Sequence, residues 1–92
     1  MPRVKVKYLN VYYSMTRKEE EFIAFDDAFT LGELLDKVSE FYKPKFRDSI
    51  FDKENNLKPH AWILVNKKRE KDLNRRLKGG EVVVFSLPVV GG

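Results

Sequence analysis

The sequence has no cysteine and only one histidine, and these absences exclude several classes of protein. Without cysteine the chain can have no disulfide framework, no thiolate metal site and no cysteine nucleophile. His60 has acidic residues only at scattered spacing around it, so we expect no metal site. No Ser/His/Asp constellation and no phosphate-binding glycine loop is present either. We therefore do not expect the domain to be an enzyme by itself.

Long apolar runs are also missing. None approaches the roughly 18 residues of a membrane-spanning helix, and no signal-peptide pattern opens the chain. We therefore expect a cytoplasmic protein that makes no membrane contacts. Its 92 residues, 42% of them hydrophobic, suffice for one domain with one modest core. The excess of 18 basic over 14 acidic residues permits an acidic partner surface.

Basic residues are dense in one stretch, residues 66–78, where seven of thirteen are lysine or arginine. No aromatic residues are interleaved with them, so we expect no base stacking and no nucleic-acid binding. The stretch is interpreted as a solvated edge or a docking surface for an acidic partner, with Arg75 and Arg76 as candidate contacts. Phe85 and Leu87 are further candidate contacts. The alternation of side chains along the last strand does not decide whether Phe85 lies in the core or in an exposed apolar patch beside the tail.

The first third of the chain predicts a strand hairpin followed by a helix. Residues 3–9 alternate strictly, which indicates a half-buried strand; residues 10–14 are expected to extend it, and 20–25 to form the second strand. Thr30 and Glu33 have the spacing of a capping box, and Phe29 can pack on Leu34 as a hydrophobic staple. Pro44 is expected to end the helix. Its apolar stripe comprises Leu31, Leu34, Leu35, Val38 and Phe41.

The remaining sequence predicts a short helical turn near 46–51 and three more strands. Residues 61–66 are too apolar for an edge and predict a central strand, buried on both faces, with Trp62 in the core. Asn66 suits a tight turn before a short, charged edge strand at 67–71. Gly79 and Gly80 predict the turn into a last strand at 81–87, which is also apolar on both faces.

This order of elements predicts an α+β, two-layer fold with one main helix on a mixed sheet of about five strands. A right-handed crossover through the helix is expected to place the third strand parallel to the first, with the last strand near the middle. That arrangement is a β-grasp, the ubiquitin fold. We expect the domain to occupy residues 1–87 and a flexible, extended diglycine tail to occupy 88–92.

The final Gly91-Gly92 contributes almost nothing to the stability of a folded domain, because glycine buries no side chain and loses the most entropy on ordering. The sequence resembles the ubiquitin-like sulfur carriers, especially the small subunit of molybdopterin synthase and the archaeal small modifiers. The resemblance covers nearly the whole chain. Its motifs are "TLGELLDKV", "FRDSIFDKENNLKPHAWILVN", "LKGGEVVVF" and "PVVGG". The chain departs from the molybdopterin type by having one proline, Pro88, where two are usual, and Asn66-Lys67 in place of Asn-Gly.

The resemblance implies that an activating enzyme uses ATP to adenylate the carboxylate of Gly92. A sulfur donor then gives a thiocarboxylate, which passes its sulfur to a precursor in the large catalytic subunit of molybdopterin synthase or to another acceptor. Gly91 is the slim neighbour, and Pro88, Val89 and Val90 form the arm that enters the partner. No cofactor is expected to be bound tightly. The same tail permits a modifier joined to lysines, and an adaptor without tail chemistry is the third alternative.

Overall fold

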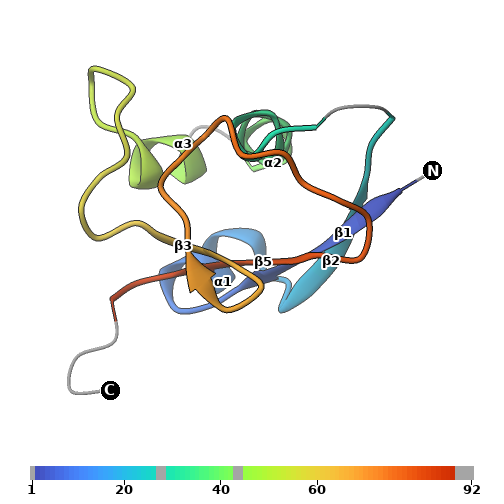
Figure 1. Cartoon of the computed structure of the whole chain (residues 1–92). Helices are drawn as coiled ribbons and strands as arrows, with labels where there is room; N and C mark the ends of the chain where they lie inside the picture. The colour runs from blue at the N-terminus through green and yellow to red at the C-terminus, as the bar shows by residue number, and fades with distance from the viewer. Residues whose placement is uncertain (1, 27–28, 43–44, 89–92) are drawn as a thin grey trace.

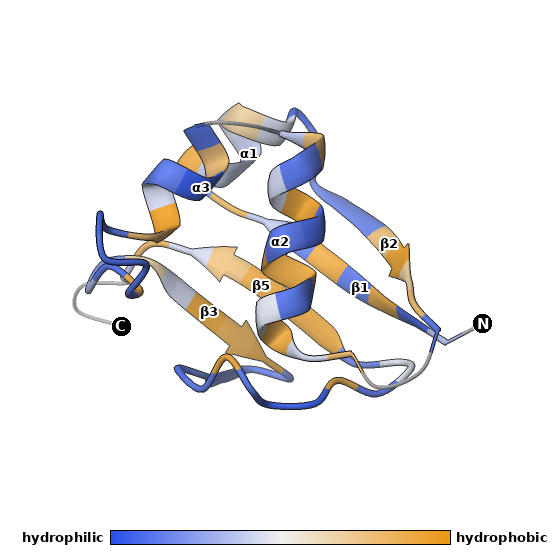
Figure 2. Cartoon of the chain, turned by 90° about the horizontal axis from the view of Figure 1, so that it is seen from above, coloured by the Kyte–Doolittle hydropathy of each residue, from blue (hydrophilic) through white to orange (hydrophobic). Residues whose placement is uncertain are grey.

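The computed structural model describes residues 2–26, 29–42 and 45–88. Within them, three helices lie with a five-stranded sheet (Figure 1). Figure 2 shows the longest helix lying across one face of the sheet, with the two short helices gathered at one end. The predicted α+β architecture is confirmed. The elements in chain order are β1 (Arg3–Tyr8), α1 (Val11–Thr16), β2 (Glu20–Ala24), α2 (Leu31–Phe41), α3 (Lys45–Ile50), β3 (Trp62–Val65), β4 (Lys68–Arg69) and β5 (Val82–Ser86).

The strands lie in the order β2-β1-β5-β3-β4, so the last strand is at the centre of the sheet. β5 pairs parallel with β1 and antiparallel with β3, as the β-grasp prediction requires. The predicted direction of the third strand is wrong, because β3 runs antiparallel to β5 and therefore also to β1. The reason is that α2 connects β2, not β1, to β3. A crossover makes the strands that it joins run in the same direction, and β2 is antiparallel to β1.

The capping box at the start of α2 is confirmed. The Thr30 hydroxyl accepts a hydrogen bond from the Glu33 N–H at 3.1 Å, and the Glu33 carboxylate accepts one from the Thr30 N–H at 3.0 Å. Four of the five predicted stripe residues are buried, but Phe41 is 54% exposed, because it lies in the last turn beyond the sheet-facing stripe. The helix ends at Phe41, and Pro44 lies outside the described residues.

Residues 10–14 do not extend the first strand, as predicted, but lead into α1. Asn10 has a φ of 55°, which breaks the extended path after β1. Tyr12 and Thr16, one turn apart, are then buried, while three of the other four residues of the helix are exposed. The valine and tyrosines of this stretch have high strand propensity, and burial of one helical face overrides it here.

β3 and β5 each bury one face only, so the prediction of strands buried on both faces is wrong. Ile63 and Val65 point into the core, whereas Trp62 and Leu64 are half-buried on the open face of the sheet. The Arg69 guanidinium lies over the Trp62 ring, 4.4 Å from its centroid. The left-handed turn at Asn66, the short β4 edge and the helical turn α3 are confirmed.

A polar network joins β1, β2 and the end of α2. The Glu21 carboxylate accepts hydrogen bonds from the hydroxyls of Tyr8 and Tyr42, both at 2.6 Å, and from Lys18 Nζ at 3.3 Å. Burial opposes ionisation of Glu21, but the hydrogen bonds from Tyr42, Tyr8 and Lys18 outweigh it and hold its pKa below the ordinary value. Burial, followed by the hydrogen bond to Glu21, raises the pKa of Tyr8.

Replacing Glu21→Gln is expected to lower the free energy of unfolding at pH 7 by about 1–3 kcal/mol, because the variant loses a charged acceptor shared by two phenols. The folded-state pKa of Glu21 is depressed, so its stabilisation is present above the unfolded pKa of about 4.3 and is lost as the pH falls through the folded pKa. In urea denaturation, the gap between wild type and Glu21→Gln should shrink in acid. Glu19→Gln, at an exposed neighbour, is the charge-matched control; a gap that does not change with pH contradicts the account.

Candidate functional site at the end of the last strand

The sheet ladder ends where the predicted tail begins. Ser86 is the last residue of β5 and lies opposite Trp62 of β3. Leu87 is half-buried against the core, and Pro88, which has no N–H to donate, is exposed. Figure 1 shows the chain leaving the sheet beyond β5. The predicted arm residues Val89 and Val90 and the predicted reactive pair Gly91 and Gly92 lie outside the described residues.

Asn10 holds the start of this exit. Its side-chain Oδ1 accepts a hydrogen bond from the Leu87 N–H at 3.3 Å, and the neighbouring Leu9 N–H donates to Phe85 O at 3.0 Å. The Ser86 hydroxyl donates to Leu87 O at 2.8 Å. Asn10 reaches this position with a φ of 55° and a ψ of −129°, outside the left-handed helical region, so the backbone here is strained for a residue with a side chain. Sequence reasoning missed Asn10; its place directly after an alternating strand was the available signal.

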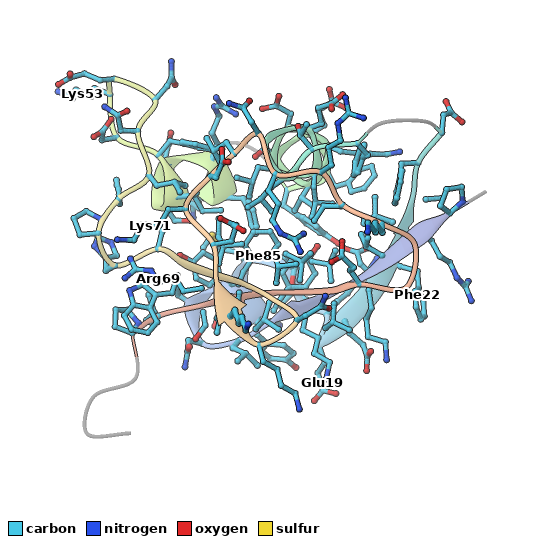
Figure 3. All side chains as sticks on the ribbon, in the orientation of Figure 1. Glu19, Phe22, Lys53, Arg69, Lys71 and Phe85 are labelled. Atoms are coloured by element: carbon cyan, nitrogen blue, oxygen red, sulfur yellow. The ribbon has the colours of Figure 1, made fainter. Side chains whose placement is uncertain are left out.

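The structure corrects the predicted docking surface. Phe85 is fully buried and stacks on Tyr8 with ring centroids 5.7 Å apart, so it belongs to the core (Figure 3). The Arg75 guanidinium forms ion pairs with Glu70 and Glu81 of the same chain. Arg76 is exposed beside Thr30 at the start of α2, while Leu87 follows the opposite end of β5. The four predicted residues therefore do not form one surface, because the inward parity of β5 buries Phe85 and an ion-pair network takes up Arg75.

That network fixes the loop between β4 and β5. Arg75 Nη2 lies 2.9 Å from Glu81 Oε2, and its Nε lies 3.1 Å from Glu70 Oε1. Glu81 also accepts hydrogen bonds from the Lys78 N–H at 2.6 Å and from the Asn66 amide at 2.9 Å. The hydrogen bond from Arg75 holds the pKa of Glu81 below its ordinary value, although burial opposes this.

The open face of the sheet is a surface that sequence reasoning missed, because β3 and β5 were expected to be buried on both faces. One row across it runs through register partners in the order Glu20, Lys7, Val84, Leu64 and Arg69. Half-buried Trp62 continues the apolar stripe to the end of β5, where the chain leaves the sheet. The apolar middle of this face can meet an apolar partner surface, and its two margins carry opposite charges, Arg69 on one side and Glu20 on the other.

Within the described ranges 2–26, 29–42 and 45–88, no three histidine, aspartate or glutamate side chains gather as metal ligands would. No helix there combines the length and the apolar character required to cross a bilayer.

The sequence matches no protein-family model and no curated protein. Solved structures do match. The small archaeal modifier protein SAMP1 from Haloferax volcanii is 20% identical, over 98% of this chain and 99% of that chain, with a TM-score of 0.82. A protein from Pyrococcus furiosus assigned as molybdopterin converting factor, subunit 1, is 25% identical over 97% and 100% of the two chains, with a TM-score of 0.79. A complex of subunits 1 and 2 of molybdopterin-converting factor from Helicobacter pylori gives 24% identity over 98% and 99%, with a TM-score of 0.64. These neighbours, an archaeal modifier and subunits of molybdopterin-converting factors, are of the kinds that the sequence resembles, and they share the fold of this chain over nearly their full length.

Adjacent arginines provide a matched test of the loop network. Arg75→Ala is expected to lower the free energy of unfolding by about 1–2 kcal/mol, because it leaves two carboxylates without their shared cation. Arg76→Ala should change it by less than about 0.5 kcal/mol, as expected for a surface substitution. Thermal or urea denaturation of the two variants decides the point, and equal stability losses would show that Arg75 has no special role.

Asn10→Ala is expected to speed hydrogen exchange of the Leu87 amide, since that N–H loses a partner worth about 1 kcal/mol. Asn55→Ala is the matched control: Asn55 also has a positive φ, of 64°, so both variants place alanine in a strained conformation. Amide exchange followed by NMR should show the acceleration at Leu87 in Asn10→Ala only. The same acceleration in both variants contradicts a specific hold on the tail base.

Proposed function

We propose that this chain is a ubiquitin-like sulfur carrier whose reactive group is the carboxylate of Gly92. The observation that carries the proposal is the position of β5: the central strand of a β-grasp sheet ends at Ser86, and residues 88–92 follow directly from it. Five extended residues span at most about 17 Å, which suits an active site buried in a partner. Structural neighbours that are small archaeal modifiers and molybdopterin-type subunits support the same role.

The chemistry needs an activating enzyme and ATP. A terminal carboxylate has a pKa of about 3.3–3.7, so it is ionised at neutral pH and can attack the α-phosphorus of ATP. Pyrophosphate leaves, and the acyl-adenylate that remains is a good electrophile. A sulfur nucleophile of the hydrosulfide class then attacks the acyl carbon, AMP leaves, and a thiocarboxylate results. ATP is therefore a substrate of the activating enzyme and not a resident cofactor of this chain.

The acceptor that we favour is the large catalytic subunit of molybdopterin synthase. The Helicobacter pylori neighbour is a complex between the two subunits of such a converting factor, which supports a partner of that kind. The open face of the sheet, with its apolar stripe, lies beside the base of the tail and is the surface that we assign to such a partner. A modifier joined to lysines is the second candidate, because the SAMP1 neighbours are small archaeal modifiers.

Adding one alanine after Gly92 should abolish adenylation while leaving the fold intact. The terminal carboxylate then belongs to a residue with a methyl group on its Cα, which a channel that fits glycine does not admit. ATP–pyrophosphate exchange with the activating enzyme measures the first step, and circular dichroism checks the fold. Lys53→Ala, at an exposed position outside the tail, is the control, since it leaves residues 88–92 unchanged. Normal exchange by the extended variant would sink the carboxylate hypothesis and leave the adaptor alternative.

A further inference from the structure

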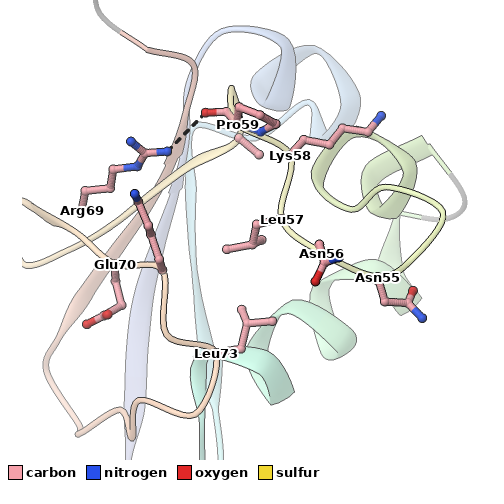
Figure 4. A pocket seen from close by; sticks show the side chains of 10 residues that line it. Asn55, Asn56, Leu57, Lys58, Pro59, Arg69, Glu70 and Leu73 are labelled. Carbon is pink, nitrogen blue, oxygen red and sulfur yellow. Dashed lines mark hydrogen bonds between the residues drawn. The ribbon is translucent and has the colours of Figure 1, made fainter.

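A groove of about 530 Å³ lies between the segment that leads into β3 and the loop that follows β4. We call it the link groove. Its size is within the range of clefts that hold ligands, about 300–1,000 Å³. Leu57 from the segment before β3 and Leu73 from the loop after β4 face one another across it (Figure 4). Ala61 is buried, and the two leucines are half-buried. The floor of the groove is therefore aliphatic.

The rim of the link groove is positively charged. Lys58, Arg69 and Lys71 contribute to its lining, and within the described residues none of the three has a carboxylate at ion-pair distance. Glu70, the acidic residue of the lining, is compensated by Arg75 Nε at 3.1 Å. Lys58 also borders a second hollow that contains Asp48 and Asp52, so Arg69 and Lys71 carry most of the positive potential.

Arg69 is held in place as one wall of the groove. Its guanidinium donates a hydrogen bond to Pro59 O at 3.2 Å and lies over the Trp62 ring. A cation fixed in this way loses little entropy when it meets an anion. Because Trp62 lies opposite Ser86, this wall stands at the end of the sheet where the chain leaves β5.

We propose that the link groove binds an acidic, extended segment of a partner protein. An aliphatic side chain of the segment enters between Leu57 and Leu73, and flanking carboxylates pair with Arg69 and Lys71. A nucleic acid fits less well, because the lining has no aromatic ring on which a base could stack. The groove requires no tail chemistry and so goes beyond the proposed function. A partner that binds both the tail and the link groove gains affinity, because the second contact forms within a complex that already exists.

The test uses the full chain labelled with ¹⁵N and the peptide acetyl-Asp-Glu-Leu-Asp-Glu-amide. The peptide should cause saturable NMR shift changes at the amides of Leu57, Ala61, Lys71 and Leu73, and added salt should weaken binding. A second peptide with glycine in place of leucine, and a third with lysines in place of the acids, should bind at least about tenfold more weakly. Equal binding of the glycine peptide would overturn the anchoring role of the leucines.

Variants locate the site. The variant Lys71→Glu should weaken binding of the leucine peptide about tenfold, because an attraction becomes a repulsion. The matched control, Lys67→Glu, changes the total charge equally at an exposed position outside the lining and should bind normally. Deletion of Gly91-Gly92 should leave peptide binding unchanged, which separates this proposal from the tail hypothesis. Shifts confined to the open face, at Lys7 and Val84, or none at millimolar peptide, would overturn the proposal.

Discussion

The pairing of β5 with both β1 and β3 is the constraint on which the rest of the structure depends. β1 and β2 form one antiparallel pair and β3 and β4 form another, and only β5 joins the two pairs into one sheet. Its inward side chains, Val83 and Phe85, are fully buried in the same core as the stripe of α2. Its parallel pair with β1 joins the first and the last strand of the chain. Because β5 is paired on both sides, the position at which the chain leaves the sheet is fixed.

Two surfaces, the open face of the sheet and the link groove, lie near the end of β5. The open face of the sheet carries the half-buried side chains of β3 and β5, with Arg69 at one margin and Glu20 at the other, and leads to the end of β5. The link groove has Arg69 in its lining, and the guanidinium of Arg69 lies over the Trp62 ring. The Glu21 and Arg75 networks serve the scaffold instead, because they tie α2 and the β4–β5 loop to the sheet. Stability and recognition thus depend on different charged residues of a chain that is rich in both signs.

Local patterns predicted local structure well. The capping box at Thr30, the alternation of β1 and the left-handed turn at Asn66 depend on neighbours in sequence, and all three are confirmed. Features set by tertiary contacts were less accessible. An apolar strand such as β3 reads the same whether its second face is covered or open, so Trp62 was misplaced. Arg75 was interpreted as a possible free surface charge because the spacing of its partners follows no helical or strand repeat. Glu70 lies five residues before it and Glu81 six residues after it, and only the loop conformation brings them together. Asn10 contacts Leu87 from the other end of the chain, a pairing that a single sequence does not reveal.

The central claim concerns the carboxylate of Gly92, and intact mass spectrometry tests it most directly. The full chain would be weighed before and after incubation with ATP, a sulfide source and the activating enzyme of its own organism, and then fragmented. The account predicts a mass gain equal to the replacement of one oxygen by sulfur, located at Gly92. An unchanged mass, under conditions where the same enzyme activates another carrier, would contradict it.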